Sequence, residues 1–176
     1  MTDAGLLNVT LADQAAWARA FRDAPEAALE EMVTATVEAS LLVEREAAEN
    51  TPVGIGGGGG LKGAWSYREP DILGDRVIGE VGNPLNYAVP VELGSKPHFP
   101  PIEPLKDWVR QKLDVELDEV DDVARMIQRK IGAHGTDGKF MLTAAIVKTE
   151  AQIREIYGAA LARVGERVGP GTGGRA

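Results

Sequence analysis

The chain has 176 residues, of which 44% are hydrophobic and 26% charged, with a formal net charge of −8 at pH 7. This length and composition predict one globular domain, and the acidic balance disfavours a nucleic-acid binder, which needs surplus Lys and Arg. The absence of cysteine excludes disulfides, thiolate chemistry and cysteine-ligated metals.

The first ten residues contain no basic-then-apolar signal, and no apolar run approaches the roughly 20 residues of a membrane span. We therefore expect a soluble protein, intracellular when made and without membrane contacts. The acidic surplus is uneven, because residues 1–60 carry ten acids against three bases, a balance of −7.

Two helices are expected in the first fifty residues. The first follows Asp13 as its cap and ends near Arg22, and its aromatic side chains Trp17 and Phe21 are expected to pack on the second. The second spans Pro25–Glu49, with proline at its first position and acids in its first turns, where the helix dipole favours them.

Five consecutive glycines, Gly56–Gly60, follow the long helix and predict a flexible linker. Gly54, Gly56 and Gly59 match the pattern GxGxxG, but a dinucleotide-binding motif follows a strand and opens a helix. This stretch follows a helix and precedes an expected strand, so we reject that interpretation and expect no cofactor.

A three-stranded antiparallel meander is expected next, packed on the long helix. The first strand, residues 61–68, places Trp65 and Tyr67 on one face and is broken at residues 69–71, and the second covers residues 76–81. The third, Tyr87–Leu93, has apolar residues at alternate positions, and Pro90 assigns it to a sheet edge.

The third strand leads into a proline-rich connector that presents Lys96, His98 and Phe99 on an ordered loop. Three more helices are expected, at residues 103–113, 118–131 and 140–164, with a turn-rich loop at residues 132–138. The predicted fold is therefore α+β, with a small antiparallel sheet of three to four strands on a long helix, followed by C-terminal helices.

The domain assignment follows from these elements. Residues 1–24 form an N-terminal arm with a short helix, and residues 25–164 form a single α+β domain. The glycine-rich residues 165–176 form a flexible tail.

Candidate catalytic chemistry is sparse. Acidic clusters such as residues 118–122 could hold Mg²⁺, which keeps a small metal-dependent hydrolase as an alternative, although helix N-termini favour acids without any metal. Ser66 or Ser95 with His98 could pair a nucleophile with a base, but no nucleophile-elbow pattern surrounds either serine. A regulatory binding module is a further class, and one that binds DNA would need a basic face.

Four motifs, spread over residues 33–157, resemble in their order and spacing the neck or tail-completion components of long-tailed, HK97-like bacteriophages. The motifs are Ala47–Gly54 with Leu61–Ser66, Tyr87–Ser95, Pro100–Val109, and Gly132–Phe140.

This resemblance implies a non-enzymatic structural protein of the virion, located at the head–tail junction and in the host cytoplasm during assembly. Such proteins form rings, commonly sixfold, that join head-closure or connector proteins to tail terminator or tail-tube proteins and let DNA pass. A prophage or a gene transfer agent is the alternative home. The residues assigned to these contacts are Gly56, Gly58, Gly60, Leu61, Trp65, Tyr87, Glu92, Lys96, His98 and Phe99.

The acidic N-terminal third suggests one further hypothesis. An acidic ring lumen would repel passing DNA, so neutralising Glu44, Glu46 and Glu49 is expected to slow DNA passage.

Overall fold

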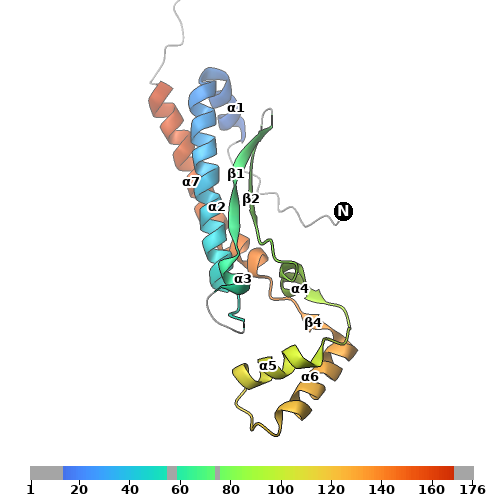
Figure 1. The fold of residues 1–176 in the computed structure, drawn as a ribbon. Coiled ribbons are helices and arrows are strands. Elements are labelled where there is room, and N and C mark those ends of the chain that lie inside the picture. The colour runs from blue at the N-terminus through green and yellow to red at the C-terminus, as the bar shows by residue number, and fades with distance from the viewer. Residues whose placement is uncertain (1–13, 55–58, 74–75, 169–176) are drawn as a thin grey trace, which may run out of the picture. The chain divides into compact units, whose positions relative to one another are not determined.

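The computed structural model describes residues 14–54, 59–73 and 76–168, and within them it contains seven helices and four strands (Figure 1). Their bounds are α1 Gln14–Asp23, α2 Pro25–Asn50, α3 Gly60–Gly63, β1 Ser66–Leu73, β2 Arg76–Gly82, α4 Ala88–Leu93, β3 Gly94–Ser95, α5 Ile102–Lys112, α6 Val120–His134, β4 Thr136–Asp137 and α7 Met141–Val168. The predicted α+β class is confirmed, with helix as the main component.

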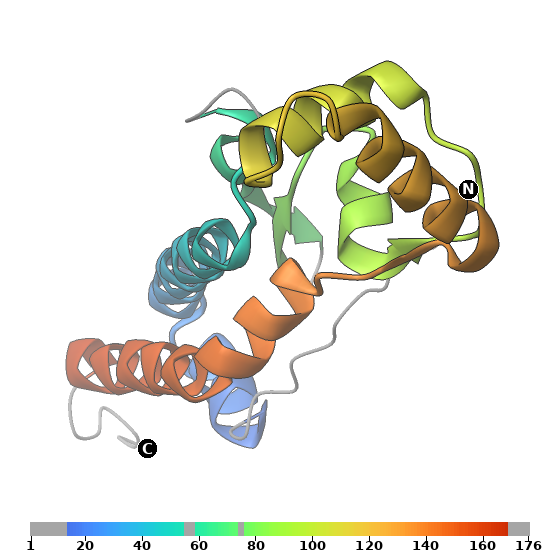
Figure 2. The ribbon, with the colours of Figure 1, turned by 90° about the horizontal axis from the view of Figure 1, so that it is seen from below.

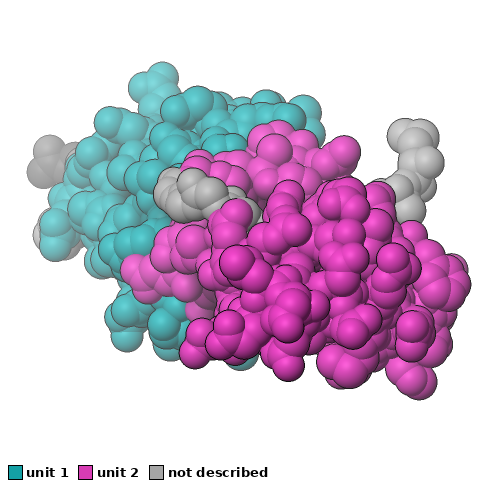
Figure 3. Space-filling view, turned by 60° about the horizontal axis from the view of Figure 1, so that its bottom comes forward, with its two compact units in different colours: residues 1–46, 66–82, 145–176 teal, residues 47–65, 83–144 magenta. Residues whose placement is uncertain are grey.

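The chain divides into two compact units, coloured separately in Figure 3. Unit 1 comprises residues 1–46, 66–82 and 145–176, and unit 2 comprises residues 47–65 and 83–144. Both boundaries in the long helices fall near an end, so α2 and α7 each contribute residues to both units. The domain limits expected at residues 24/25 and 164/165 stay predictions.

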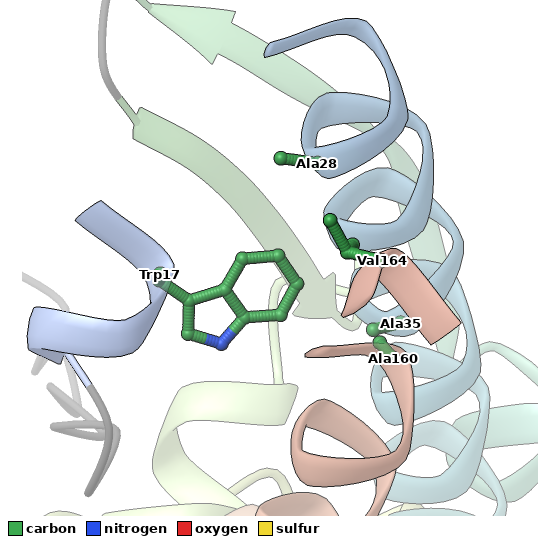
Figure 4. Close-up of a cluster of buried hydrophobic side chains, with 5 residues drawn as sticks. All are labelled: Trp17, Ala28, Ala35, Ala160 and Val164. Carbon is green, nitrogen blue, oxygen red and sulfur yellow. The ribbon is translucent and has the colours of Figure 1, made fainter. Parts of the chain in front are cut away.

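The core of unit 1 is built where α1, α2 and α7 meet (Figure 4). The indole of Trp17 is buried there, as the i, i+4 aromatic spacing predicted, and Phe21 packs at its edge. The other buried members are small or branched, namely Ala28, Ala35, Ala160 and Val164. Because alanine side chains are short, α2 and α7 can approach closely along this face.

Ion pairs also join α2 to α7 within unit 1. The buried carboxylate of Glu31 accepts from Arg163 at 2.6 Å and lies 2.9 Å from Arg167. Nearer the other end, the buried Glu46 pairs with the ammonium of Lys148. Both acids therefore act inside the fold, although sequence alone would place them on solvated helix faces.

Strands β1 and β2 form an antiparallel hairpin from Ser66 paired with Gly82 to Leu73 paired with Arg76. The expected break at residues 69–71 is wrong, because the strand continues through Pro70 with a register shift between Arg68 and Asp71. A bulge accommodates a proline because the extra residue need not donate to the ladder.

The hairpin lies along α2, and a glycine sets how closely it approaches. A β-carbon at Gly79 would lie 2.7 Å from both Ser40 Oγ and Thr36 Cγ2. The N–H of Tyr67 donates to Glu44 Oε2 at 3.1 Å, which fixes the start of β1 against the same helix. Glycine is therefore needed at position 79 for packing rather than for a turn.

In unit 2, α5 and α6 lie side by side (Figure 2) over a core of Val109, Val120 and Ala124. Lys106 of α5 pairs with Asp121 of α6 at 2.9 Å, and this hydrogen bond is the main reason that the pKa of Lys106 is raised and that of Asp121 lowered. Both helices occur close to their predicted positions, although α6 continues to His134 into the expected loop.

Two expected strands of the meander are wrong in whole or in part. Residues 60–63 form the helical turn α3, so the first strand begins only at Ser66. Residues 88–93 form α4, not a third strand, and the N–H of Val91 donates to the carbonyl of Tyr87 at 3.1 Å. Pro90 is compatible with this helix because the first-turn N–H groups have no helical acceptor.

The sheets are consequently two separate pairs, β1–β2 and β3–β4, instead of one three-stranded meander. The last helix begins one residue later than expected and continues to Val168, so four residues of the predicted tail are helical. The rest of that tail, the N-terminal residues 1–13 and the expected turn at residues 74–75 lie outside the described residues.

Candidate interaction surface

Two segments distant in sequence meet in unit 2, next to half of the predicted contact residues. Strand β3 pairs antiparallel with β4, with Gly94 opposite Asp137 and Ser95 opposite Thr136. Gly94 in β3 and Gly135 just before β4 have positive φ, and a β-carbon on either would collide with a backbone carbonyl of the other segment. The close approach of the two backbones therefore requires glycine at both places.

Glu92, one of the predicted contact residues, supplies the N-terminal cap of α7. Its carboxylate accepts from the N–H groups of Leu142 and Thr143, both at 3.0 Å, and from the Thr143 hydroxyl at 2.9 Å. These N–H groups have no acceptor within the helix, and a negative charge there is stabilised by the helix dipole. Glu92 is thus engaged inside the unit.

Phe140 stands just before α7, at a position where a polar side chain would normally cap the helix. Its φ is +50°, which is uncommon for a residue other than glycine. The backbone is held there because its N–H donates to the carbonyl of Glu92 at 3.0 Å and its own carbonyl accepts from Ala144 at 2.8 Å. Its ring nevertheless remains 50% exposed.

Further apolar side chains are exposed on α4. Val89 is 60% and Leu93 64% exposed, and their spacing of four residues puts them on one helix face. Tyr87, at the start of α4, is also exposed, and Gly60 approaches its hydroxyl group. We call Tyr87, Val89, Leu93 and Phe140 the α4 surface. Of these four residues, only Tyr87 was predicted from the sequence. The signal that points to Phe140 is an aromatic residue at the start of a helix, where its side chain has no acceptor to cap the helix.

The predicted loop residues Lys96, His98 and Phe99 are all exposed. The N–H of His98 donates to the carbonyl of Ile131 at 3.4 Å, and the ring of Phe99 lies over Gly132, where a β-carbon would be 2.6 Å away. The connector is therefore fastened to the C-terminal end of α6.

His98 is not arranged as a base for Ser95. Its Nδ1 lies 2.9 Å from the carbonyl of Lys96 and 3.4 Å from Ser95 Oγ. Because a carbonyl oxygen can only accept, Nδ1 carries the proton in this contact and cannot take another from the serine.

Trp65 and Leu61 are buried and support the unit from within. The indole N–H of Trp65 donates to Thr51 Oγ1 at 2.7 Å, and that hydroxyl donates to the carbonyl of Ala47 at 2.6 Å. The carbonyl of Leu61 accepts from the side chain of Asn83 at 2.8 Å. Gly56 and Gly58 lie outside the described residues.

Unit 1 carries an open groove of about 410 Å³ between α2 and α7. It mixes apolar side chains with acids, a base and an amide, and none of the ten sequence-predicted residues contributes to it. Its lining residues are Glu38, Leu41, Leu42, Arg45, Gln152, Glu155 and Ile156.

Residues 14–54, 59–73 and 76–168 contain no group of three or more His, Asp or Glu side chains placed to hold a metal ion. No helix among them is long and apolar enough to cross a membrane. Comparisons with protein-family models, curated proteins and solved structures found no match.

Proposed function

We propose that this chain is a structural protein of the virion neck in a long-tailed phage, where it forms a ring that helps to join or complete the tail. The ring, sixfold by resemblance, would contact connector or head-closure proteins on one side and tail terminator or tail-tube proteins on the other, with DNA passing through it. Assembly would take place in the host cytoplasm. The gene would belong to a phage, a prophage or a gene transfer agent.

The observation that carries the proposal is the α4 surface. Its exposed apolar side chains stand on backbone that Glu92, Gly94 and Phe140 hold by hydrogen bonds or close contacts. A rigid exposed apolar surface is typical of a protein contact, because ordering it on binding costs little entropy. The second motif of the resemblance, residues 87–95, covers most of this surface.

The element order adds support. The long helix α2, the proline-rich connector that leads into α5, and the final long helix α7 follow one another in the order that the motifs imply.

The decisive experiment is mass measurement by light scattering, first on the purified chain and then with connector or tail-tube proteins from the same gene cluster. We expect a ring alone or with these partners, and a double variant Val89→Ser/Leu93→Ser that loses the complex. The matched control Leu41→Ser/Val147→Ser, which changes exposed apolar residues of α2 and α7 in unit 1, should retain it. A wild-type monomer that ignores every partner would refute the proposal.

A further inference from the structure

The helix pair of unit 2 has opposite charges at its two ends. The residues from Leu113 to Asp122, which link α5 to α6 and begin α6, include six acids and no base. The following residues 123–134, which complete α6, include Arg125, Arg129 and Lys130 but no acid. We call these the acidic end and the basic end.

The connector extends the basic end. Lys96, His98 and Phe99 are exposed, and they reach the C-terminal turn of α6 through the contacts of His98 with Ile131 and of Phe99 with Gly132. At the acidic end, Lys106 pairs with Asp121, but Asp114 and Glu116 have no ion pair among the described residues.

Each end also exposes a large apolar side chain. Leu117 at the acidic end is 82% exposed and Phe99 at the basic end is 71% exposed. No other large apolar side chain in the described part of the chain is as exposed as these two. Each charged end therefore combines an exposed apolar side chain with charged residues, and protein contacts use both kinds of group.

Within the unit, Asp121 is attracted by Lys106, Arg110 and Arg125, so this part of the acidic end is already balanced. Helix α6 has 15 residues, which separate its ends by roughly 22 Å, more than twice the screening length of about 8 Å in physiological salt. A second copy of the chain offers opposite charges to Asp114 and Glu116 at one end and to Arg129 and Lys130 at the other.

We propose that copies of this chain associate head to tail, with the acidic end of one copy bound to the basic end of the next. Leu117 enters beside Phe99 of the neighbour, and Asp114 and Glu116 face Arg129 and Lys130. Such a contact joins two different surfaces, so its repetition closes into a ring when the rotation between copies allows it. The inference deepens the proposed function and rests on its ring assembly.

A charge-swap experiment tests this contact on the full chain. The first variant is Asp114→Lys/Glu116→Lys, and the second is Arg129→Glu/Lys130→Glu. We expect each alone to associate at least about tenfold more weakly than wild type in sedimentation at low salt, because like charges then meet. An equimolar mixture should recover the assembly, since each altered end then finds its complement.

Controls separate charge complementarity from loss of fold. Glu38→Lys/Glu166→Lys makes the same change in net charge as the first variant, at exposed positions of unit 1, and should assemble like wild type. Leu117→Ser should weaken assembly without charge change. Circular dichroism and melting temperature check that every variant is folded, and raising the salt should weaken wild-type association.

The outcomes distinguish this contact from the proposed function. If wild type forms a ring and both charge variants do so equally well, or if the mixture fails to recover, the head-to-tail contact is overturned while the neck role stands. If wild type assembles as described but binds no connector or tail protein, the contact stands and the neck role fails. A wild type that never self-associates, alone or with those proteins, overturns both.

Discussion

At the scale of single residues, the cap of α7 comes from a side chain about 50 positions away. The residue before the helix is Phe140, whose side chain has no acceptor, and the carboxylate of Glu92 accepts three hydrogen bonds in its place. We predict that Glu92→Ala costs about 1–2 kcal/mol of stability and exposes the first turn of α7.

Amide hydrogen exchange measures this effect where it arises. The amides of Leu142 and Thr143 should exchange faster in Glu92→Ala, and Glu92→Gln should lie between it and wild type because the amide keeps one acceptor. Glu116→Ala, an exposed acid of the same unit, is the control. Unchanged exchange at both amides would mean that the cap does not hold this turn.

Tyr157 makes the stability of the fold depend on pH. Burial raises the pKa of its phenol above the ordinary value of 10, and the hydrogen bond with Thr36 at 2.9 Å opposes the shift only in part. The unfolded phenol therefore loses its proton at a lower pH than the folded one. The contribution of Tyr157 to stability is complete below about pH 10 and is lost as the pH rises through the folded pKa.

We accordingly predict a crossover in the variant Tyr157→Phe. At neutral pH it should be about 1 kcal/mol less stable than wild type, because the hydrogen bond with Thr36 is lost. Between about pH 9 and pH 11 its stability should decline less steeply, since no phenol ionises. Urea unfolding across that range measures both effects, and parallel pH profiles would contradict the prediction.

At the scale of elements, the hairpin depends on close contact with α2. Alanine at position 79 would bring a methyl group to 2.7 Å from Ser40 and Thr36, so the strand must shift away. We predict that Gly79→Ala destabilises unit 1 by about 1–3 kcal/mol. Gly82 is a matched control in the same strand, since a β-carbon there meets nothing within 4 Å. Equal unfolding midpoints in urea for the two variants would refute this account.

Elements whose signals are local could be predicted from sequence. Helix α2 begins at Pro25 and shows acids in its first turns, and α5 and α6 carry apolar residues at helical spacing. These features depend on neighbours within a few residues, so periodicity and capping rules are sufficient to place them.

Elements whose structure depends on distant partners could not be predicted in this way. Residues 88–93 fit both a strand and a helix by pattern, and their neighbours in space are residues 136–140, which bond to the segment 91–95. The cap by Glu92 and the packing of Gly79 likewise need contacts across 50 and about 40 positions. The exposure of Phe140 and Leu117 could not be predicted from sequence either, because it depends on which residues pack around them in the folded chain.

At the scale of the whole molecule, the structure changes how the acidic-lumen hypothesis must be tested. Of the three acids first chosen, Glu44 accepts the N–H of Tyr67 and Glu46 is buried against Lys148. Neutralising either removes an internal partner, so slower DNA passage in those variants would report damage to the fold. Glu49 is exposed, and Glu38 offers a second exposed acid.

The sharper prediction pairs two double variants in the assembled particle. Glu44→Gln/Glu46→Gln should lower the melting temperature of the chain. The loss of unfolding free energy should be about 1 kcal/mol per contact, and for Glu46 it is limited because Lys148 is largely exposed. Glu38→Gln/Glu49→Gln should leave the melting temperature unchanged. If these acids face the channel of the proposed ring, the second variant should slow DNA ejection. The reason is that less negative charge remains in the channel to repel the passing phosphates and keep the DNA from sticking. Ejection at the wild-type rate from particles that contain this stable variant would remove the electrostatic role and leave the acidic N-terminal third to serve the helix pairing of unit 1.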